Sequence, residues 1–346
     1  MTTEPTIAWR DGALELIDQT RLPAELVSLR LTTVPGVIDA IKRLAVRGAP
    51  AIGVAGAYGV ALAATADDPR TAPAAFDAAV AALRSARPTA VNLARMVDRV
   101  AAVARATGND PVAADPASRA LAEAHRVRDE EREASQAMGE RGADLVADLV
   151  GRTPVRAMTI CNTGGLATVE RGTALAVIQT LHERGVLAEA IAMETRPLLQ
   201  GARLTAWELG RMGAPHRLAV DGAGPFLLAR GAADVVLIGA DRVAANGDTA
   251  NKIGSYSLAL GAARAGVPFL VVAPESTVDV ATPSGADIEI EDRGPAEVVA
   301  WGGVATAPPG TAAINPAFDV TPVDLITALV TDRRVVRFDR GDTLTP

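Results

Sequence analysis

The chain contains a single cysteine, Cys161, among its 346 residues. One thiol excludes a disulfide framework and a thiolate zinc site, and it fits a protein of the reducing cytoplasm. Free cysteine usually packs as a small apolar residue. The role of Cys161 therefore depends on what surrounds it in the fold.

Histidine and lysine are also scarce. The three histidines show no metal-ligand spacing, and neither a P-loop nor a dinucleotide-binding fingerprint is present, which argues against a metal site and a bound nucleotide. The only lysines are Lys42 and Lys252, and the net charge is -7. This negative net charge argues against a nucleic-acid-binding surface.

Membrane-directing segments are not expected either. The N-terminal stretch "MTTEPTIAWRDG" has neither the basic region nor the apolar region of a signal peptide. Residues 48–66 carry no charge and approach the length of a membrane span, but they consist mainly of Ala and Gly and include Pro50. We interpret this run as a tightly packed buried helix.

The pattern along the chain predicts two domains. Residues 7–18 predict a β-hairpin turning at Asp11-Gly12, and residues 37–104 are mainly helical. A loop at 106–118 precedes a long helix at 119–150. We expect a small, mainly helical N-terminal domain over residues 1–120 and an α/β domain over residues 121–346, with 121–150 as the connecting helix.

After Gly151, short apolar runs alternate with helical stretches. Alternation of this kind predicts βαβ units, and continuous apolar strands predict a parallel sheet that is covered on both faces. We expect a doubly wound, Rossmann-like domain. Its predicted strands are "VRAMTIC", "EAIAMET", "HRLAVDG", "ADVVLIGAD" and "PFLVVAP".

Reactive side chains follow several of these strands. Open α/β sheets bind ligands beyond the carboxyl ends of their strands, and Cys161, Glu194, Asp221 and Asp241 all lie at such ends. Helix capping or loop hydrogen bonding is the competing interpretation, and for Glu194 and Asp221 it is as good as a catalytic one. The position of Cys161 beside "NTGG" favours a role other than core packing.

A phosphate site is predicted near residue 250. We expect "GDTANKIGSYSLAL" to place Thr249, Asn251 and Lys252 at the start of a helix, where free N–H groups and the helix dipole favour an anion. Because the nucleotide-binding patterns are missing, a small phosphorylated substrate is the better interpretation.

Six motifs spread over nearly the whole chain are distinctive as a set. They are "VRGAPAIG" (46–53), "RPTAVNL" (87–93), "TICNTGGLAT" (159–168), "ETRPLLQGARLTAWEL" (194–209), "IGADRVAANGDTANKIGSYSLA" (238–259) and "NPAFDVTP" (315–322). Together they resemble the 5-methylthioribose-1-phosphate isomerase family of methionine salvage. This family shares its fold with the alpha, beta and delta regulatory subunits of the eukaryotic translation initiation factor exchange complex.

The resemblance implies a site in the cleft between the two domains, a homodimer, and a reaction without metal or cofactor. By position, Cys161 and Asp241 match the family's catalytic residues. The positions that match its substrate-binding residues are Arg47, Gly48, Ala49, Arg87, Gln200, Asn251 and Lys252.

Three positions depart from the family pattern: Ser135, Gly222 after Asp221, and Glu275. They leave open a different substituent at C5 of the sugar, as in 5-deoxyribose 1-phosphate or 5-fluoro-5-deoxyribose 1-phosphate. Ribose 1,5-bisphosphate is another candidate substrate. A non-catalytic regulatory subunit of the exchange-factor type is the alternative of another class.

The chemistry assigned by resemblance also leaves two routes open. Asp241 is the candidate acid at the ring oxygen, and its apolar approach "VVLIGA" is compatible with a desolvated carboxyl of raised pKa. Cys161 is then either the base of an enediol route or part of a dry pocket for hydride transfer from C2 to C1. No lysine or histidine lies near it in sequence to hold a thiolate, which favours hydride transfer.

Overall fold

The computed structural model describes residues 5–87, 91–106 and 115–344. It divides into two compact units, which we call the N-terminal unit (Met1–Ser135 with Gly164–Gly172) and the C-terminal unit (Gln136–Thr163 with Thr173–Pro346). This division differs from the predicted boundary at residue 120, because helix α5 (Pro116–Val150) is continuous and contributes to both units.

Segment Gly164–Gly172 belongs to the N-terminal unit although it follows a strand of the other. The Thr6 N–H donates to Val169 O at 2.9 Å, and Gln19 Nε2 donates to Leu166 O at 2.7 Å. Such long-range bonds leave no local signal in the sequence.

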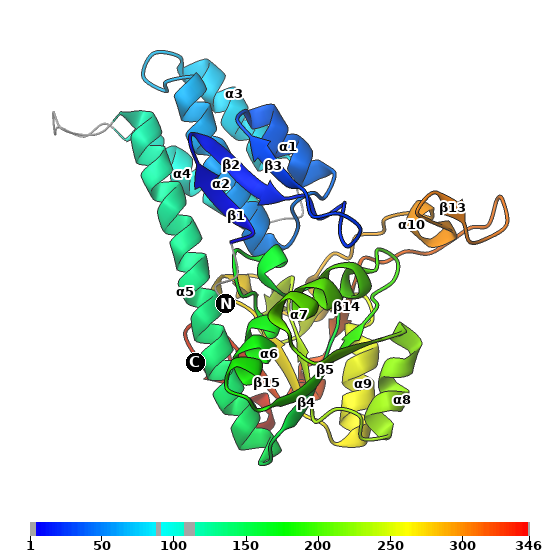
Figure 1. Cartoon of the computed structure of the whole chain (residues 1–346). Helices are drawn as coiled ribbons and strands as arrows, with labels where there is room; N and C mark the ends of the chain where they lie inside the picture. The colour runs from blue at the N-terminus through cyan, green and yellow to red at the C-terminus, as the bar shows by residue number, and fades with distance from the viewer. Residues whose placement is uncertain (1–4, 88–90, 107–114, 345–346) are drawn as a thin grey trace. The chain divides into compact units, whose positions relative to one another are not determined.

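The N-terminal unit combines a small antiparallel sheet with helices (Figure 1). The predicted hairpin is confirmed as β1 (Ile7–Arg10) and β2 (Ala13–Ile17), with Asp11 and Gly12 at positive φ. Strand β3, which pairs with β2, was not predicted. The remaining elements are β3 (Ser28–Leu31), α1 (Val34–Lys42), α2 (Ala49–Ala66), α3 (Pro73–Arg84) and α4 (Val91–Arg105).

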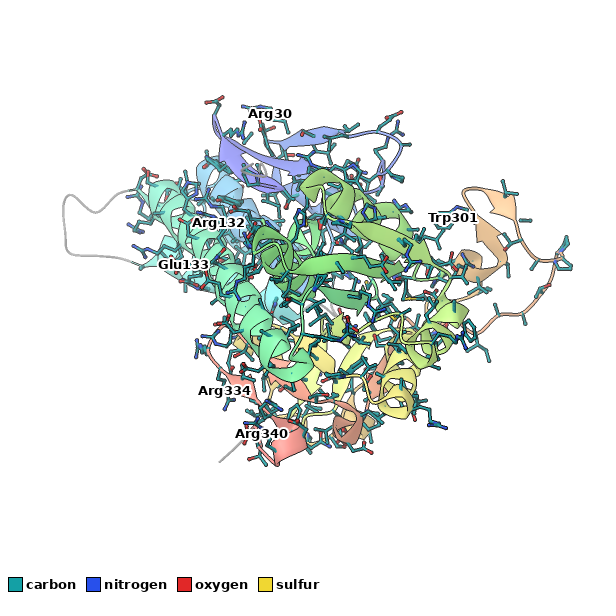
Figure 2. The ribbon with its side chains drawn as sticks, turned by 60° about the horizontal axis from the view of Figure 1, so that its bottom comes forward. Arg30, Arg132, Glu133, Trp301, Arg334 and Arg340 are labelled. Carbon is teal, nitrogen blue, oxygen red and sulfur yellow. The ribbon has the colours of Figure 1, made fainter. Side chains whose placement is uncertain are left out.

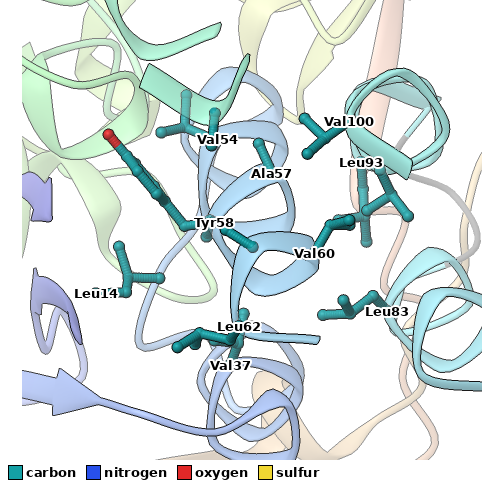
Figure 3. Close-up of a cluster of buried hydrophobic side chains, with 14 of the residues drawn as sticks. Leu14, Val37, Val54, Ala57, Tyr58, Val60, Leu62, Leu83, Leu93 and Val100 are labelled. Carbon is teal, nitrogen blue, oxygen red and sulfur yellow. The ribbon is translucent and has the colours of Figure 1, made fainter. Parts of the chain in front are cut away.

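Helix α2 is the centre of this unit's core (Figure 3). Its glycines allow close packing, since a Cβ at Gly56 would lie 2.5 Å from Leu93 Cδ1 of α4. By length and composition α2 could cross a membrane, but 78% of the helix is buried inside the protein. The prediction of a buried, tightly packed helix is confirmed.

The C-terminal unit is built on a seven-stranded sheet of order β16-β15-β10-β7-β4-β5-β6. All of its pairs are parallel except β15 with β16. All five predicted strands are present. The strands are β4 (Val155–Thr159), β5 (Leu187–Met193), β6 (His216–Ala219), β7 (Val235–Ile238), β10 (Phe269–Val272), β15 (Ala328–Val330) and β16 (Val335–Val336).

This order is that of a doubly wound fold, confirming the predicted class. From β4 the chain builds outward to β5 and β6, then returns to β7 on the other side of β4. The topological switch point, where such sheets bind ligands, therefore lies between β4 and β7.

Helices cover both faces of the sheet (Figure 1). Helix α6 (Ala174–Glu183) packs on β4 and β5 and against the last part of α5, where Gly142 meets Val177. On the other face, Leu228 of α8 (Gly224–Ala229) and Leu258 of α9 (Ser255–Ala265) share one core cluster with the sheet. A short π-helix (Gly201–Thr205) leads into α7 (Ala206–Met212).

A second, four-stranded sheet follows β7, in the order β11-β8-β9-β14. Its strands are β8 (Arg242–Ala244), β9 (Thr249–Lys252), β11 (Val278–Asp279) and β14 (Phe318–Thr321). The prediction that Thr249, Asn251 and Lys252 begin a helix is therefore wrong. They form β9 because they pair with β14, which lies about seventy residues further along the chain.

The segment between β11 and β14 carries a short helix, α10 (Ala296–Val299), and a hairpin of β12 (Ala300–Trp301) and β13 (Val304–Ala305). Figure 2 shows Trp301 on this segment. Its side chain lies under the guanidinium of Arg203, 6.0 Å from the ring centre.

Candidate active site

Cys161 lies just beyond the end of β4 and is 8% exposed. Its φ of 65° is left-handed, a conformation that few residues other than glycine adopt. Its N–H donates to Thr195 Oγ1 at 2.8 Å, and its carbonyl accepts from Thr205 Oγ1 at 2.6 Å. The cysteine therefore lies at the strand end, as predicted, with both of its backbone groups held by side chains.

The segment after β5 provides these threonines. Asp221 accepts the N–H of Thr195 at 2.8 Å and that of Arg196 at 2.7 Å. The sequence left two interpretations of Asp221 open, a catalytic role and loop hydrogen bonding. These contacts support loop hydrogen bonding. Glu194 continues the pairing with the neighbouring strand, since its N–H donates to Ala219 O at 2.8 Å.

Gln200 occupies the same segment and is 2% exposed. Its Oε1 has no hydrogen-bond partner among the described residues. The backbone next to it touches the end of β5, because a Cβ at Gly201 would lie 1.6 Å from Met193 O. Gln200 is therefore held close to the edge of the sheet, and its side-chain oxygen can accept a hydrogen bond from a ligand.

Asp241 lies beyond β7, the neighbour of β4 in the sheet. Thr159 pairs with Leu237, so Cys161 and Asp241 follow adjacent strands on the two sides of the switch point. The backbone N–H of Asp241 donates to Ala250 O at 2.9 Å. Asp241 is an exposed residue in this structure.

Asn251 and Lys252 are buried on β9. Asn251 Nδ2 donates to Ser255 Oγ at 2.8 Å. Lys252 Nζ donates to Ala317 O at 2.8 Å and lies 4.5 Å from the centre of the Phe318 ring. The ammonium group therefore also ties β9 to β14.

The N-terminus of α9, predicted to bind phosphate, already holds a carboxylate. Asp319 accepts the N–H of Gly254 at 2.7 Å and that of Tyr256 at 3.2 Å. Burial raises the pKa of Asp319 to about 6, although these donors oppose the shift. Because Asp319 comes from β14, the local sequence could not reveal it.

The other four predicted residues belong to the N-terminal unit. Gly48 has φ 94°, and a Cβ there would lie 2.3 Å from Ala167 O, so only glycine fits. Ala49 begins α2, whose N-terminus has no side-chain cap. Arg47 precedes it, and Arg87 follows α3; both are half-buried. Uncapped N–H groups beside arginine are suited to an anion.

No group of three or more His, Cys, Asp or Glu side chains able to hold a metal ion occurs among the residues described. Of the three departures from the family pattern, Glu275 has a structural partner, and Gly222 follows a residue that has one. Asp221, which precedes Gly222, holds the loop after β5, and Glu275 Oε1 accepts from Arg334 Nη2 at 2.8 Å. Ser135 is buried in α5.

Residues 45–337 match the model of the Initiation factor 2 subunit family. The chain belongs to this family.

Within the family, the chain is similar to several isomerases. It is 52% identical over 335 residues to a probable bifunctional methylthioribose-1-phosphate isomerase/methylthioribulose-1-phosphate dehydratase of Nocardia farcinica, covering 96% of the chain but 59% of that relative. It is 50% identical to the methylthioribose-1-phosphate isomerase of Alkalilimnicola ehrlichii (96% and 94% covered). It is 49% identical to the 5-deoxyribose 1-phosphate isomerase of Moorella thermoacetica (96% and 93%).

Two solved structures of the family are similar at 40% identity. The 5-methylthioribose 1-phosphate isomerase of Pyrococcus horikoshii has a TM-score of 0.90, with 97% of this chain and 93% of that chain covered. A protein of A. fulgidus described as translation initiation factor eIF-2B, subunit delta, has a TM-score of 0.87, with 97% and 96% covered. The fold is thus compatible with either description, and the site residues must decide between them.

Proposed function

We propose that this protein is an aldose–ketose isomerase that converts 5-methylthioribose 1-phosphate into 5-methylthioribulose 1-phosphate in methionine salvage. The observation that carries the proposal is the placement of Cys161 and Asp241 beyond adjacent strands at the switch point of the sheet. The similarity to isomerases of about 50% identity over nearly the whole chain supports it.

The substrate's phosphate blocks the anomeric oxygen, so the free aldehyde cannot form. Asp241 donates a proton to the ring oxygen as the bond from C1 to that oxygen breaks, and the phosphate-bearing oxygen shares the charge left on C1. Hydride then moves from C2 to C1, and the 2-hydroxyl loses its proton to give the ketone. That proton restores the acid.

Asp241 has to be protonated for this step, whereas an ordinary aspartate with a pKa of about 3.9 is ionised at neutral pH. The negative charge and the bulk of a bound sugar phosphate would both raise the pKa of Asp241.

For the phosphate, we propose the uncapped N-terminus of α2 with Arg47, Gly48, Ala49 and Arg87. Gln200, Asn251 and Lys252 complete the proposed binding residues. This assignment replaces the N-terminus of α9, which Asp319 occupies.

A turnover assay tests the function. The protein is incubated with 5-methylthioribose 1-phosphate and the ketose product is followed by phosphorus NMR. We expect turnover, with kcat/KM higher than for 5-deoxyribose 1-phosphate or ribose 1,5-bisphosphate. A preference for the 5-deoxy sugar would instead support the second candidate, which the relative of Moorella thermoacetica favours. No turnover of any of the three would support a regulatory subunit.

Deuterium at C2 separates the two routes. Hydride transfer keeps the label at C1, whereas a base would expose it to exchange with water. We expect complete retention, because apolar stretches, "VRAMTIC" and "ADVVLIGAD", lead up to both Cys161 and Asp241. Loss of the label to solvent would make Cys161 the leading base.

We further propose a cytoplasmic homodimer that binds neither nucleic acid nor membrane. Exposed apolar side chains gather on α8 and α9, where Phe226 is 65%, Leu260 46% and Tyr256 40% exposed. They border an apolar groove between the two helices, lined by Pro225, Ala229, Ser257, Leu260, Gly261 and Arg264. A second copy of the chain would cover this surface.

A further inference from the structure

We propose that Thr195 and Thr205 are positioning residues, which fix the Cys161 thiol by holding both backbone groups of that residue. The inference rests on the proposed function for its catalytic meaning, but the contacts themselves are a property of the C-terminal unit. Both threonines are 0% exposed, so water does not compete for their hydrogen bonds.

Cys161 needs such support because its backbone is left-handed. A non-glycine residue keeps this conformation only where its surroundings hold it, and such residues cluster at functional sites. Here the support comes from the N–H bond to Thr195 and the carbonyl bond from Thr205. With both bonds in place, the direction of the Cα–Cβ bond, and hence the place of the sulfur, is defined.

Thr195 connects the loop after β4, the end of β5 and Asp221. Its hydroxyl accepts from Cys161 N–H and donates to Met193 O at 2.9 Å. Its own backbone, at φ 67°, is anchored by Asp221. Serine could make both hydroxyl bonds and valine neither, although valine has the same shape as threonine.

Thr205 holds two consecutive residues. Its hydroxyl hydrogen is used for Cys161 O, so its lone pair faces Asn162 Nδ2 at 3.3 Å. Thr205 is the last residue of the short π-helix Gly201–Thr205, and short π-helices occur often at functional sites. The π-helix places this hydroxyl against the loop after β4.

The test uses Thr195→Val and Thr205→Val beside the matched serine variants. Thr321→Val is the control, because Thr321 is also 0% exposed but its hydroxyl has no partner among the described residues. Two readouts are taken: kcat and KM with 5-methylthioribose 1-phosphate, and the rate at which iodoacetamide alkylates the protein. Since Cys161 is the only cysteine, alkylation reports on it alone.

We expect each valine variant to lower kcat at least tenfold with little change in KM. Alkylation should accelerate about tenfold, because a buried thiol reacts through local opening and one buried hydrogen bond opposes that opening. The serine variants and Thr321→Val should remain close to wild type in both readouts.

The proposal is overturned if the valine variants keep alkylation rates and kcat within about twofold of wild type, or if serine is as harmful as valine. If the wild type turns over none of the sugars, the proposed function fails while alkylation still tests the two threonines. If a valine variant does not fold, the alanine variant at the same position takes its place as the variant without a hydroxyl. It is compared with the serine variant by the same two readouts.

Discussion

Serine and asparagine are close in size to Cys161 and Asp241, so these two replacements should disturb little packing. Cys161 is just beyond β4 and Asp241 just beyond β7, and Asp241 is exposed. We expect Cys161→Ser and Asp241→Asn each to lose nearly all turnover while the melting temperature changes little. Steady-state kinetics and thermal unfolding of the same preparations provide the check. A Cys161→Ser protein that loses stability but keeps kcat would make the cysteine a core residue.

Arg87 and Lys252 are two of the three cations that we assign to substrate binding, beside Arg47. Arg87→Ala should raise KM about tenfold to a hundredfold, because a charge-assisted hydrogen bond to an anion is lost. Lys252→Ala should raise KM and also lower the melting temperature, because Lys252 bonds to Ala317 O. The control is Lys42→Ala, the exposed second lysine. An unchanged KM in both variants would move the phosphate elsewhere.

Among the elements, the turn between β9 and α9 depends on a carboxylate. Asp319 caps α9 from β14, and burial raises its pKa to about 6. An unfolded chain has an Asp pKa of about 3.9, so the folded protein binds this proton more tightly. Asp319 therefore favours folding most below pH 4, and this contribution is lost as pH rises through about 6.

Denaturant unfolding at several pH values tests this linkage. The free energy of unfolding of the wild type, minus that of Asp319→Asn, should fall by about 2–3 kcal/mol between pH 4 and pH 7 and stay level above it. A difference that does not change with pH would show that Asp319 titrates normally.

The segment after β5 is limited by backbone contact at Gly201. A Cβ there would lie 1.6 Å from Met193 O, so Gly201→Ala must move the segment that carries Gln200 and Thr205. We expect it to lower both kcat and stability. Gly210→Ala in α7 is the matched control, since its new Cβ would meet only His216 Cε1 at 3.9 Å. That change should be neutral or stabilising by up to about 1 kcal/mol. Equal activity of the two variants would contradict the argument.

At the scale of the whole molecule, association through α8 and α9 is the testable property. Phe226→Asp places a charge in the exposed apolar surface and should convert a dimer into a monomer, because a buried unpaired charge is costly. Light scattering after size exclusion measures the mass. Leu26→Asp, at a side chain that is 55% exposed in the N-terminal unit, should stay dimeric. A monomeric wild type, or a dimeric Phe226→Asp protein, would refute this interface.

The amino-acid sequence by itself determined the fold class, the five strands, the buried helix α2 and the placement of Cys161 and Asp241 at strand ends. These features depend on local hydrophobic periodicity and on turn residues, which neighbouring positions encode. Only the tertiary structure decided that Thr249–Lys252 is a strand, that Asp319 caps α9 and that Thr195 and Thr205 hold Cys161. Those contacts join residues 34 to 72 positions apart, and pairing with a distant strand overrides the local preference for a helix.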